Sequence, residues 1–307
     1  MRALFLLLSA NRQLKRWSSR SRFARAAARR FVAGDSIEQA IAAIRTMNER
    51  GLKATLDHLG ENAETEAQAI AAADGYLVAL DYIGQTGVQS HVSVKATQLG
   101  LDLGTAFCLA NLERVVARAR EIGTFLRMDM ESSAYTDRTF EVLHGLRDEY
   151  DNVGVVVQAY LLRSRVDVLG LIDAGIPVRL CKGAYKEPAS VAFHRKSDID
   201  QSMIDLMQLL LSEEARHKGA RLALATHDEK LIEATKAFAD AHDIPRSAYE
   251  FQMLYGIRPA LQQQLADEGF EVRVYVPYGT EWYPYVMRRL GERPATAWFL
   301  LRNLLTR

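Results

Sequence analysis

The feature that most constrains this chain is a repeated alternation of short β-rich runs with longer helical patterns. Eight such pairs follow one another after residue 50. The predicted strands are Lys53–Leu56, His91–Ala96, Phe125–Met130, Val153–Tyr160, Val178–Ala184, Arg221–Thr226, Tyr249–Leu254 and Val272–Val276. The predicted helices are Ala63–Ile83, Thr105–Glu121, Thr136–Glu149, Ser164–Ala174, Ile199–Lys218, Glu229–His242, Pro259–Glu268 and a closing segment from Pro284. Strands that alternate with helices in this way predict βαβ units and a parallel sheet.

Several strands are continuously apolar, as Gly154–Val157 shows, which is typical of a parallel sheet covered on both faces. Eight units predict an α/β fold, a distorted TIM-like (β/α)8 barrel, because eight is the number that closes this architecture. The alternative is an open doubly wound sheet, and the lack of a GxGxxG pattern after the first strand counts against it. We expect one domain, with helices in residues 1–50 packed on a barrel of residues 51–307 whose last helix covers the active site.

The N-terminal region has a composition of its own. The apolar run Leu4–Leu8 is too short to span a bilayer, and residues 12–30 are rich in Arg and Ser without any acidic residue. Such a composition fits a mitochondrial presequence, but apolar residues such as Phe23 and Phe31 among the basic ones favour a retained amphipathic helix. Contact with an anionic membrane surface is a further alternative. A helix capped by Asp35 or Ser36 then runs to about Arg50.

Charge and cysteine content exclude several classes of protein. The chain has 39 Lys and Arg against 38 Asp and Glu, which gives no overall basic surface for nucleic acid. Its two cysteines form no CxxC, so we expect a reducing compartment, the cytoplasm, with peripheral contact at the inner face of the membrane as an addition. Seven histidines without an HExxH pattern or a close His/Cys cluster argue against a metal site.

The ends of the predicted strands are unusually polar. They offer, in order, Asp57, Lys95, Asp129 with Glu131, Gln158 with Tyr160, Lys182 with Tyr185, Thr226-His227-Asp228, Gln252 and Tyr275. A single charged strand end is often only a structural ion pair. So many at the C-terminal mouth of a barrel indicate a functional site, because buried charge without a partner is costly.

Lys95 and Asp129 end neighbouring strands, so we expect them to face each other. They form either a salt bridge at the rim or a group in which Asp129 keeps Lys95 charged to hold a substrate carboxylate. Lys95 or Lys182 can alternatively form a Schiff base, as in barrel aldolases, if its pKa is lowered.

The closing segment Tyr283–Glu292 contains two adjacent arginines. A helix that begins near Pro284 places Tyr285, Arg288 and Arg289 on one face, where the arginine pair can grip a carboxylate or a phosphate. The alternative is a solvated basic face.

A second dense motif, Arg179–Tyr185, ends the fifth predicted strand. Alternation directs Arg179 and Cys181 to one face and Lys182 to the other, while Gly183 allows close approach of the backbone. Cys181 can be a nucleophile, although a cysteine inside an apolar strand is more often inert packing.

Taken in order, these motifs resemble the proline dehydrogenase family in its single-function bacterial form. The resemblance covers almost the whole chain. It lies in Val92–Gly100, Arg127–Glu131, Val157–Leu161, Arg179–Tyr185, Ala225–Asp228, Glu250–Gly256 and the YxxRR of the closing segment. Cys181 departs from the aliphatic residue usual in the family, which questions local packing rather than chemistry.

The resemblance implies a distorted (β/α)8 barrel that binds FAD at its mouth without a Rossmann domain. It implies oxidation of L-proline to Δ1-pyrroline-5-carboxylate, electrons passed to a membrane quinone, and a separate pyrroline-5-carboxylate dehydrogenase downstream. The implied substrate-binding residues are Lys95, Arg288 and Arg289 at the carboxylate, with Asp129, Tyr275, Tyr285, Tyr185 and Leu254 around the ring. The implied FAD contacts are Met130, Gln158, Arg179, Lys182, Gly183, Ala184, Thr226, His227 and Glu292.

Hydride transfer to a flavin needs positioning and charge matching more than a nucleophile. Arg179 is expected to stabilise charge on the reduced flavin, and Asp129, Tyr275 or solvent can take the proton of the proline amine. Two other classes remain open on these residues: a Schiff-base aldolase, and a non-catalytic protein that uses its basic N-terminus to bind a membrane surface.

Overall fold

Eight parallel strands close into a barrel in chain order, and β8 pairs with β1 to complete it. The computed structural model describes residues 28–60 and 62–292. The strands are β1 (Lys53–His58), β2 (Ser90–Lys95), β3 (Leu126–Asp129), β4 (Val153–Gln158), β5 (Val178–Cys181), β6 (Leu222–Ala225), β7 (Tyr249–Leu254) and β8 (Val272–Tyr278). The predicted (β/α)8 barrel is therefore confirmed.

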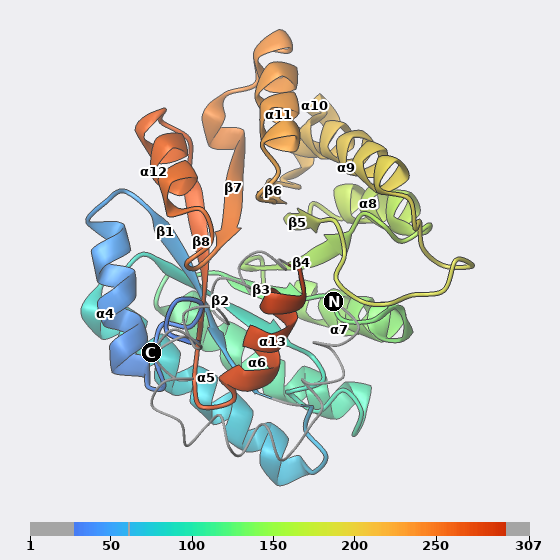
Figure 1. Cartoon of the computed structure of the whole chain (residues 1–307). Coiled ribbons are helices and arrows are strands. Elements are labelled where there is room, and N and C mark those ends of the chain that lie inside the picture. The colour runs from blue at the N-terminus through green and yellow to red at the C-terminus, as the bar shows by residue number, and fades with distance from the viewer. Residues whose placement is uncertain (1–27, 61, 293–307) are drawn as a thin grey trace.

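The described residues form ten α-helices, most of which pack around the outside of the barrel (Figure 1). They are α4 (Ile37–Asn48), α5 (Glu66–Thr86), α6 (Thr105–Glu121), α7 (Thr136–Arg147), α8 (Ser164–Asp173), α9 (Lys196–Leu211), α10 (Glu213–Lys218), α11 (Glu229–Ala241), α12 (Pro259–Asp267) and α13 (Trp282–Glu292). Two short 3-10 helices, η1 (Ser133–Tyr135) and η2 (Arg246–Ala248), lie in loops. The part of the N-terminal prediction that concerns residues 1–27 lies outside the described residues.

The sequence predicted one helix over 199–218, and this was wrong because the structure has two helices that meet at Ser212. The ψ angle of Ser212 is 157°, which is extended, and its Oγ accepts a hydrogen bond from the Ala215 N–H at 3.2 Å. A serine before two glutamates is a typical start of a helix. Local capping therefore interrupts an otherwise continuous helical pattern.

The expected cap at the start of α4 is also different. Ser36 is in the N-cap position but makes no capping hydrogen bond with its side chain. The Oε1 of Gln39 instead accepts a hydrogen bond from the Asp35 N–H at 2.9 Å. A side chain from the first turn thus reaches back to the backbone, as in half of a capping box.

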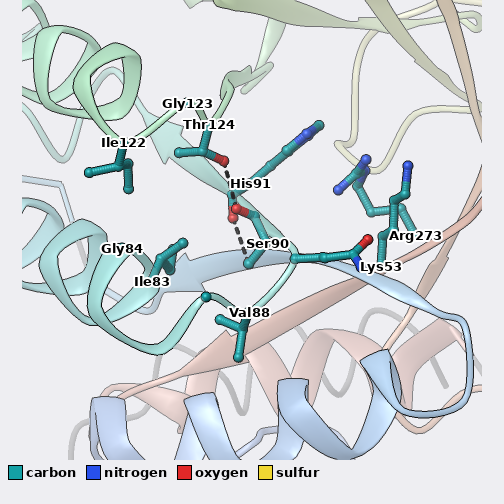
Figure 2. Close-up of a pocket in the computed structure, with 12 residues that line it drawn as sticks. Lys53, Ile83, Gly84, Val88, Ser90, His91, Ile122, Gly123, Thr124 and Arg273 are labelled. Atoms are coloured by element: carbon teal, nitrogen blue, oxygen red, sulfur yellow. Dashed lines mark hydrogen bonds between the residues drawn. The ribbon is translucent and has the colours of Figure 1, made fainter.

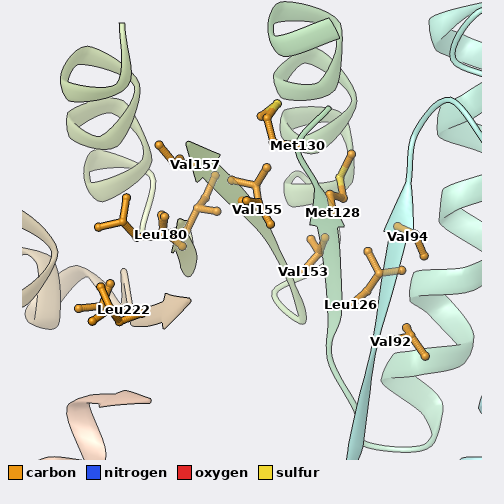
Figure 3. Close-up of a cluster of buried hydrophobic side chains, with 14 of the residues drawn as sticks. Val92, Val94, Leu126, Met128, Met130, Val153, Val155, Val157, Leu180 and Leu222 are labelled. Atoms are coloured by element: carbon orange, nitrogen blue, oxygen red, sulfur yellow. The ribbon is translucent and has the colours of Figure 1, made fainter. Parts of the chain in front are cut away.

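The two faces of the strands differ in chemistry. Outward-facing residues such as Val92, Val94, Leu126 and Met128 are fully buried and form the main hydrophobic cluster between barrel and helices (Figure 3). Alternate residues carry polar side chains that bond to one another inside the barrel. Of the strands, β4 is buried at every residue, as the apolar run predicted. Most of the other strands carry polar side chains on their inner face, where they form a network of charges, whereas β6 has only Leu and Ala residues.

The helix α13 packs at the end of the barrel where the strands terminate. Its Trp282, Tyr285 and Val286 form a buried cluster with Leu59, which follows β1, and Ile257, which follows β7. Within residues 28–60 and 62–292, no helix has both the length and the apolar composition needed to cross a membrane.

Candidate active site

Asp129, the last residue of β3, is the centre of the polar cluster at the mouth of the barrel. Its Oδ1 accepts hydrogen bonds from Ser93 Oγ and Arg179 Nη1, both at 2.7 Å. Its Oδ2 accepts a third from the Tyr275 hydroxyl, also at 2.7 Å. The three donors come from β2, β5 and β8, so closure of the barrel is what brings them to one carboxylate. Three donors to one carboxylate hold it in a single orientation.

Lys95 does not pair with Asp129 as expected. Its Nζ lies 2.7 Å from Oδ1 of Asp57, which is fully buried. Asp57 belongs to β1, whereas Asp129 belongs to β3 on the other side of β2. Both oxygens of Asp129 are already occupied by the donors described above, and this leaves Asp57 as the available counter-ion. Lys95 remains at the mouth, on the strand next to Asp129.

The electrostatics of Lys95 favour its charged form. Burial alone would lower the pKa of this amine, but the carboxylates of Asp57 and Asp129 outweigh that effect and raise the pKa above its ordinary value. A lysine that forms a Schiff base needs a lowered pKa. The environment of Lys95 is therefore suited to binding an anion and not to nucleophilic attack.

Arg179 connects the mouth with the barrel interior. Its Nε donates to Gln252 Oε1 at 2.5 Å and its Nη1 also donates to Ser93 Oγ at 3.1 Å. The guanidinium lies 5.3 Å from the centre of the Tyr275 ring. Among the described residues, the buried Nη2 of Arg179 has no hydrogen-bond partner. A buried donor of this kind usually has an acceptor in the functional state, so Nη2 marks a place for a ligand atom.

The loop after β5 presents a second polar group. Lys182 Nζ lies 2.5 Å from Asp200 of α9 and 2.9 Å from Asp228, the residue before α11. These contacts lower the pKa of Asp228, for which the hydrogen bond from Lys182 is the largest cause. The Nζ of Lys182 is therefore held in position by two carboxylates at the rim.

Gly183 has a φ of +119°, and a Cβ on it would approach the Tyr160 ring to 2.2 Å. Only glycine fits this conformation and this contact. The next residue, Ala184, donates its N–H to Gln158 Oε1 at 3.2 Å, while Gln158 Nε2 donates to the Glu131 carbonyl at 2.8 Å. Gln158 thus links the ends of β3 and β5.

Two further residues predicted for the cofactor follow β6. Thr226 Oγ1 accepts the Asp228 N–H at 3.1 Å, and His227 Nε2 accepts the Leu254 N–H at 3.0 Å. The acceptor role of Nε2 assigns the ring proton of a neutral His227 to Nδ1. Met130 is buried in the main cluster, next to Asp129 in the chain.

The closing helix brings aromatic and basic residues to the same end of the barrel. Tyr285 is buried, and the Arg289 guanidinium lies 5.4 Å from the centre of its ring, which fits the prediction that they share one face. Leu254 packs against the same cluster, and Tyr185 is 39% exposed in the loop after β5. The backbone of Arg288 and Glu292 belongs to α13, but their side chains lie outside the described residues.

Cys181 does not have the properties of a nucleophile. Burial raises the pKa of its thiol to about 12, so the reactive thiolate is scarce at neutral pH. The same cause raises the pKa of Cys108 to about 12.

The structure adds Ser93 to the predicted site residues and gives partners to Asp57 and Gln252, which the sequence indicated only as polar strand ends. Ser93 lies two residues before Lys95 and therefore on the same face of β2. A serine does not by itself indicate a site residue, but the alternation of side chains along β2 could have placed Ser93 on the face that carries Lys95. The hydrogen bonds from Arg179 to Gln252 and from Lys95 to Asp57 depend on which strands lie near each other in the barrel. A local sequence pattern does not predict this arrangement.

Comparison with known proteins places this geometry in context. A family model described as proline dehydrogenase matches residues 40–302. Proline dehydrogenase 1 of Bacillus subtilis is 41% identical over 305 residues, which cover 99% of both chains. Proline dehydrogenase of Deinococcus radiodurans is 41% identical over 283 residues, 91% of this chain and 90% of the relative.

The fold is also found in larger proteins. The crystal structure of proline utilization A from Bdellovibrio bacteriovorus, inactivated by N-propargylglycine, superposes with a TM-score of 0.80 at 26% identity. The similarity covers 87% of this chain and 32% of that one, so this chain corresponds to about a third of the solved protein.

Proposed function

This chain belongs to the proline dehydrogenase family and is an oxidoreductase of proline catabolism, and on that premise we propose its cofactor, electron acceptor and site residues. The reaction is the oxidation of L-proline to Δ1-pyrroline-5-carboxylate, with FAD as cofactor and a membrane quinone as acceptor. The observation that carries the proposal is the buried Arg179 Nη2 without a partner, beside the Asp129 carboxylate.

The residues of the mouth fit FAD. Bound FAD supplies an acceptor for the hydride of proline. Arg179 would donate to it through Nη2, and the backbone at Gly183 offers a surface without a side chain. Lys182 is positioned by two carboxylates and His227 by its bond to Leu254. The remaining proposed contacts are Met130, Gln158, Ala184, Thr226 and Glu292.

The substrate end of the site is proposed to contain Lys95, Arg288 and Arg289 at the proline carboxylate. Lys95 is kept charged by Asp57, so it can attract the carboxylate without a proton transfer. Tyr275, Tyr285, Tyr185 and Leu254 would enclose the ring and exclude water from it. A small ring held at its carboxylate has little freedom, and this orients the carbon next to nitrogen.

Proline must lose its ammonium proton before hydride leaves, and Tyr275 is poorly suited to accept it. Burial and the Asp129 carboxylate raise the pKa of the Tyr275 phenol well above its ordinary value, so the hydroxyl keeps its proton. That proton is already donated to Asp129. Asp129 or solvent therefore remains as the acceptor, with Tyr275 and Arg179 holding Asp129 in place.

Outside the site we propose that electrons leave to a membrane quinone through peripheral contact with the membrane from the cytoplasmic side. The pyrroline product would then pass to a separate pyrroline-5-carboxylate dehydrogenase. These assignments extend the family membership, and the geometry of the mouth does not depend on them.

The experiment that tests the proposal begins with the visible spectrum of the purified protein. We expect a flavin spectrum that L-proline bleaches under anaerobic conditions. A colourless protein that borohydride traps with a carbonyl substrate would instead identify an aldolase, and a protein without either property would be a binding protein.

Replacement of Arg289 by Met should lower kcat/KM about tenfold to a hundredfold, mainly through KM, because a charged hydrogen bond is lost. Exposed Arg165→Met on α8 is the matched control and should leave both constants unchanged.

A further inference from the structure

A pocket of about 340 Å³ lies at the end of the barrel opposite the candidate active site. Its walls come from the first residues of β1, β2 and β8 and from the loops that precede β2 and β3 (Figure 2). The proposed FAD and proline residues are at or beyond the other ends of the strands. This pocket is therefore separate from the site described above.

One wall of the pocket is basic. Lys53 Nζ lies 2.9 Å from Glu271, and this carboxylate is also bound by Arg221 and Arg273, each at 3.1 Å. Arg273 has one more carboxylate partner, Glu250, at 3.1 Å. Three cations therefore share two carboxylates around this wall. An ammonium group has three N–H donors, and the contact with Glu271 uses only part of the capacity of Lys53.

Arg127, on the inner face of β3, increases the surplus of positive charge. Its Nη1 donates to the carbonyl oxygens of Val155 and Pro177, and among the described residues it has no acidic partner. Burial is the largest cause that lowers the pKa of Arg127, to about 9, which still leaves it charged at neutral pH.

His91 lines the same pocket and is uncharged. Burial and the nearby Arg273 hold the pKa of His91 well below its ordinary value. In residues 28–60 and 62–292, no hydrogen bond uses either nitrogen of the His91 ring. A neutral imidazole has one N–H donor, so His91 can bind an anion without gaining a proton.

The opposite wall is apolar. Ile83, Val88 and Ile122 lie on one side of the pocket, and Lys53 and Arg273 lie on the other (Figure 2). The C-terminal ends of α5 and α6 also point to this region, and each contributes roughly half a negative charge that acts within its last turn. Four cations, Lys53, Arg221, Arg273 and Arg127, stand against the two carboxylates Glu250 and Glu271, so a positive surplus remains over these partial charges.

We propose that this pocket binds a short-chain aliphatic carboxylate. The carboxylate group is held by Lys53 and His91 beside the buried charge of Arg273, and the hydrocarbon chain lies against Ile83, Val88 and Ile122. A fully polar anion would leave the apolar wall unused, and a neutral apolar molecule would leave the donors without an acceptor.

Butyrate is the probe for the test, added to the FAD-loaded full-length protein with methyl-labelled isoleucines. The methyl signals of Ile83 and Ile122, assigned by Ile→Val substitution, should shift and saturate. The signal of Ile257, which packs beside α13, reports binding of butyrate at the mouth. It should not follow the titration curve of Ile83 and Ile122. Sodium chloride at equal ionic strength and butanol should give no saturable shift at Ile83 and Ile122.

Lys53→Met should weaken butyrate binding about tenfold or more, because a charged hydrogen bond is removed, and should leave proline oxidation unchanged. Lys218→Met is the matched control, since Lys218 is 38% exposed against 37% for Lys53 and is also ion-paired, with Asp173 and Glu214. Its affinity for butyrate should equal that of the wild type. Equal shifts with chloride or butanol, no saturation, or unchanged affinity in Lys53→Met would each overturn the proposal.

Discussion

At the scale of single residues, the site is determined by which carboxylate each cation reaches. Asp129 takes Arg179, Ser93 and Tyr275, while Asp57 takes Lys95. The two carboxylates therefore have different roles. Asp129 is fixed in position by three donors, whereas Lys95 keeps its charge through a partner that is itself buried.

Asp57→Asn tests the role of that partner. Removal of the carboxylate should lower the pKa of Lys95, because burial then faces less opposing charge. Lys95 would lose its proton at lower pH, and KM for proline should begin to rise at lower pH than in the wild type. Steady-state kinetics across the alkaline range measure this shift. Asp81→Asn removes a half-exposed carboxylate paired with Arg118 at 2.8 Å and should leave the profile unchanged. An unchanged profile in Asp57→Asn would show that Lys95 does not depend on this pair.

The cysteines give a second prediction at this scale. Because the pKa of both Cys108 and Cys181 is about 12, we expect neither thiol to react with a disulfide reagent at neutral pH until the chain unfolds. Absorbance of the released thiolate in buffer and in urea measures both states. Rapid reaction of one thiol in buffer would contradict the raised pKa of that thiol. Activity should persist in Cys181→Ala, since the thiol takes no part in the proposed chemistry.

At the scale of elements, the loops after the strands carry most of the site, and their backbone is as important as their side chains. The loop after β5 turns at Gly183, against the Tyr160 ring. The helix α13 is attached to the loops after β1 and β7 through a buried cluster of its own. Loops held in this way by the barrel can present a rigid binding surface.

Gly183→Ala should destabilise the protein by about 1–3 kcal/mol, because the new methyl group meets Tyr160 in a left-handed conformation. It should also reduce the ratio of bound flavin to protein. The control is Gly170→Ala in α8, where no atom lies within 4 Å of the new Cβ. There alanine should stabilise the helix by about 0.5–1 kcal/mol. Urea unfolding and the flavin absorbance ratio measure both variants, and equal effects at the two positions would refute the argument.

At the scale of the whole molecule, the barrel interior is a polar network that extends from one end to the other. Arg179 bonds to Gln252, Gln252 to Glu250, and Glu250 to Arg273. Each member satisfies its neighbour, which is the condition under which buried polar groups are tolerated. The apolar stabilisation comes from the outer faces of the strands and the helices around them.

Glu250→Gln should destabilise the fold by about 3–5 kcal/mol, because Arg273 would lose a buried partner. Burial alone would raise the pKa of Glu250, but Arg273 outweighs it and holds the pKa well below the ordinary value of 4.5. The contribution of this pair is therefore present above that value and is lost as the pH falls through the lower folded-state pKa. Urea unfolding at neutral and acidic pH should show a smaller loss in acid for Glu250→Gln than for the wild type.

Glu121→Gln serves as the control for this measurement. Glu121 is 63% exposed and pairs with Arg118 at 2.7 Å on the surface of α6. An exposed ion pair contributes less than about 1 kcal/mol, so the free energy of unfolding should change little. A similar cost for both substitutions would mean that the buried network is not what stabilises the barrel.

The sequence by itself determined the barrel, the order of its strands and the polar strand ends, because these follow from local periodicity and from strand–helix alternation. Resemblance in ordered motifs was sufficient to indicate the family. Only the tertiary structure decided the partners: Lys95 with Asp57, and Asp129 with three donors. Closure of the barrel brings strands distant in the chain together, and several donors then compete for each carboxylate. That competition depends on distances across the barrel, which periodicity along the chain does not contain.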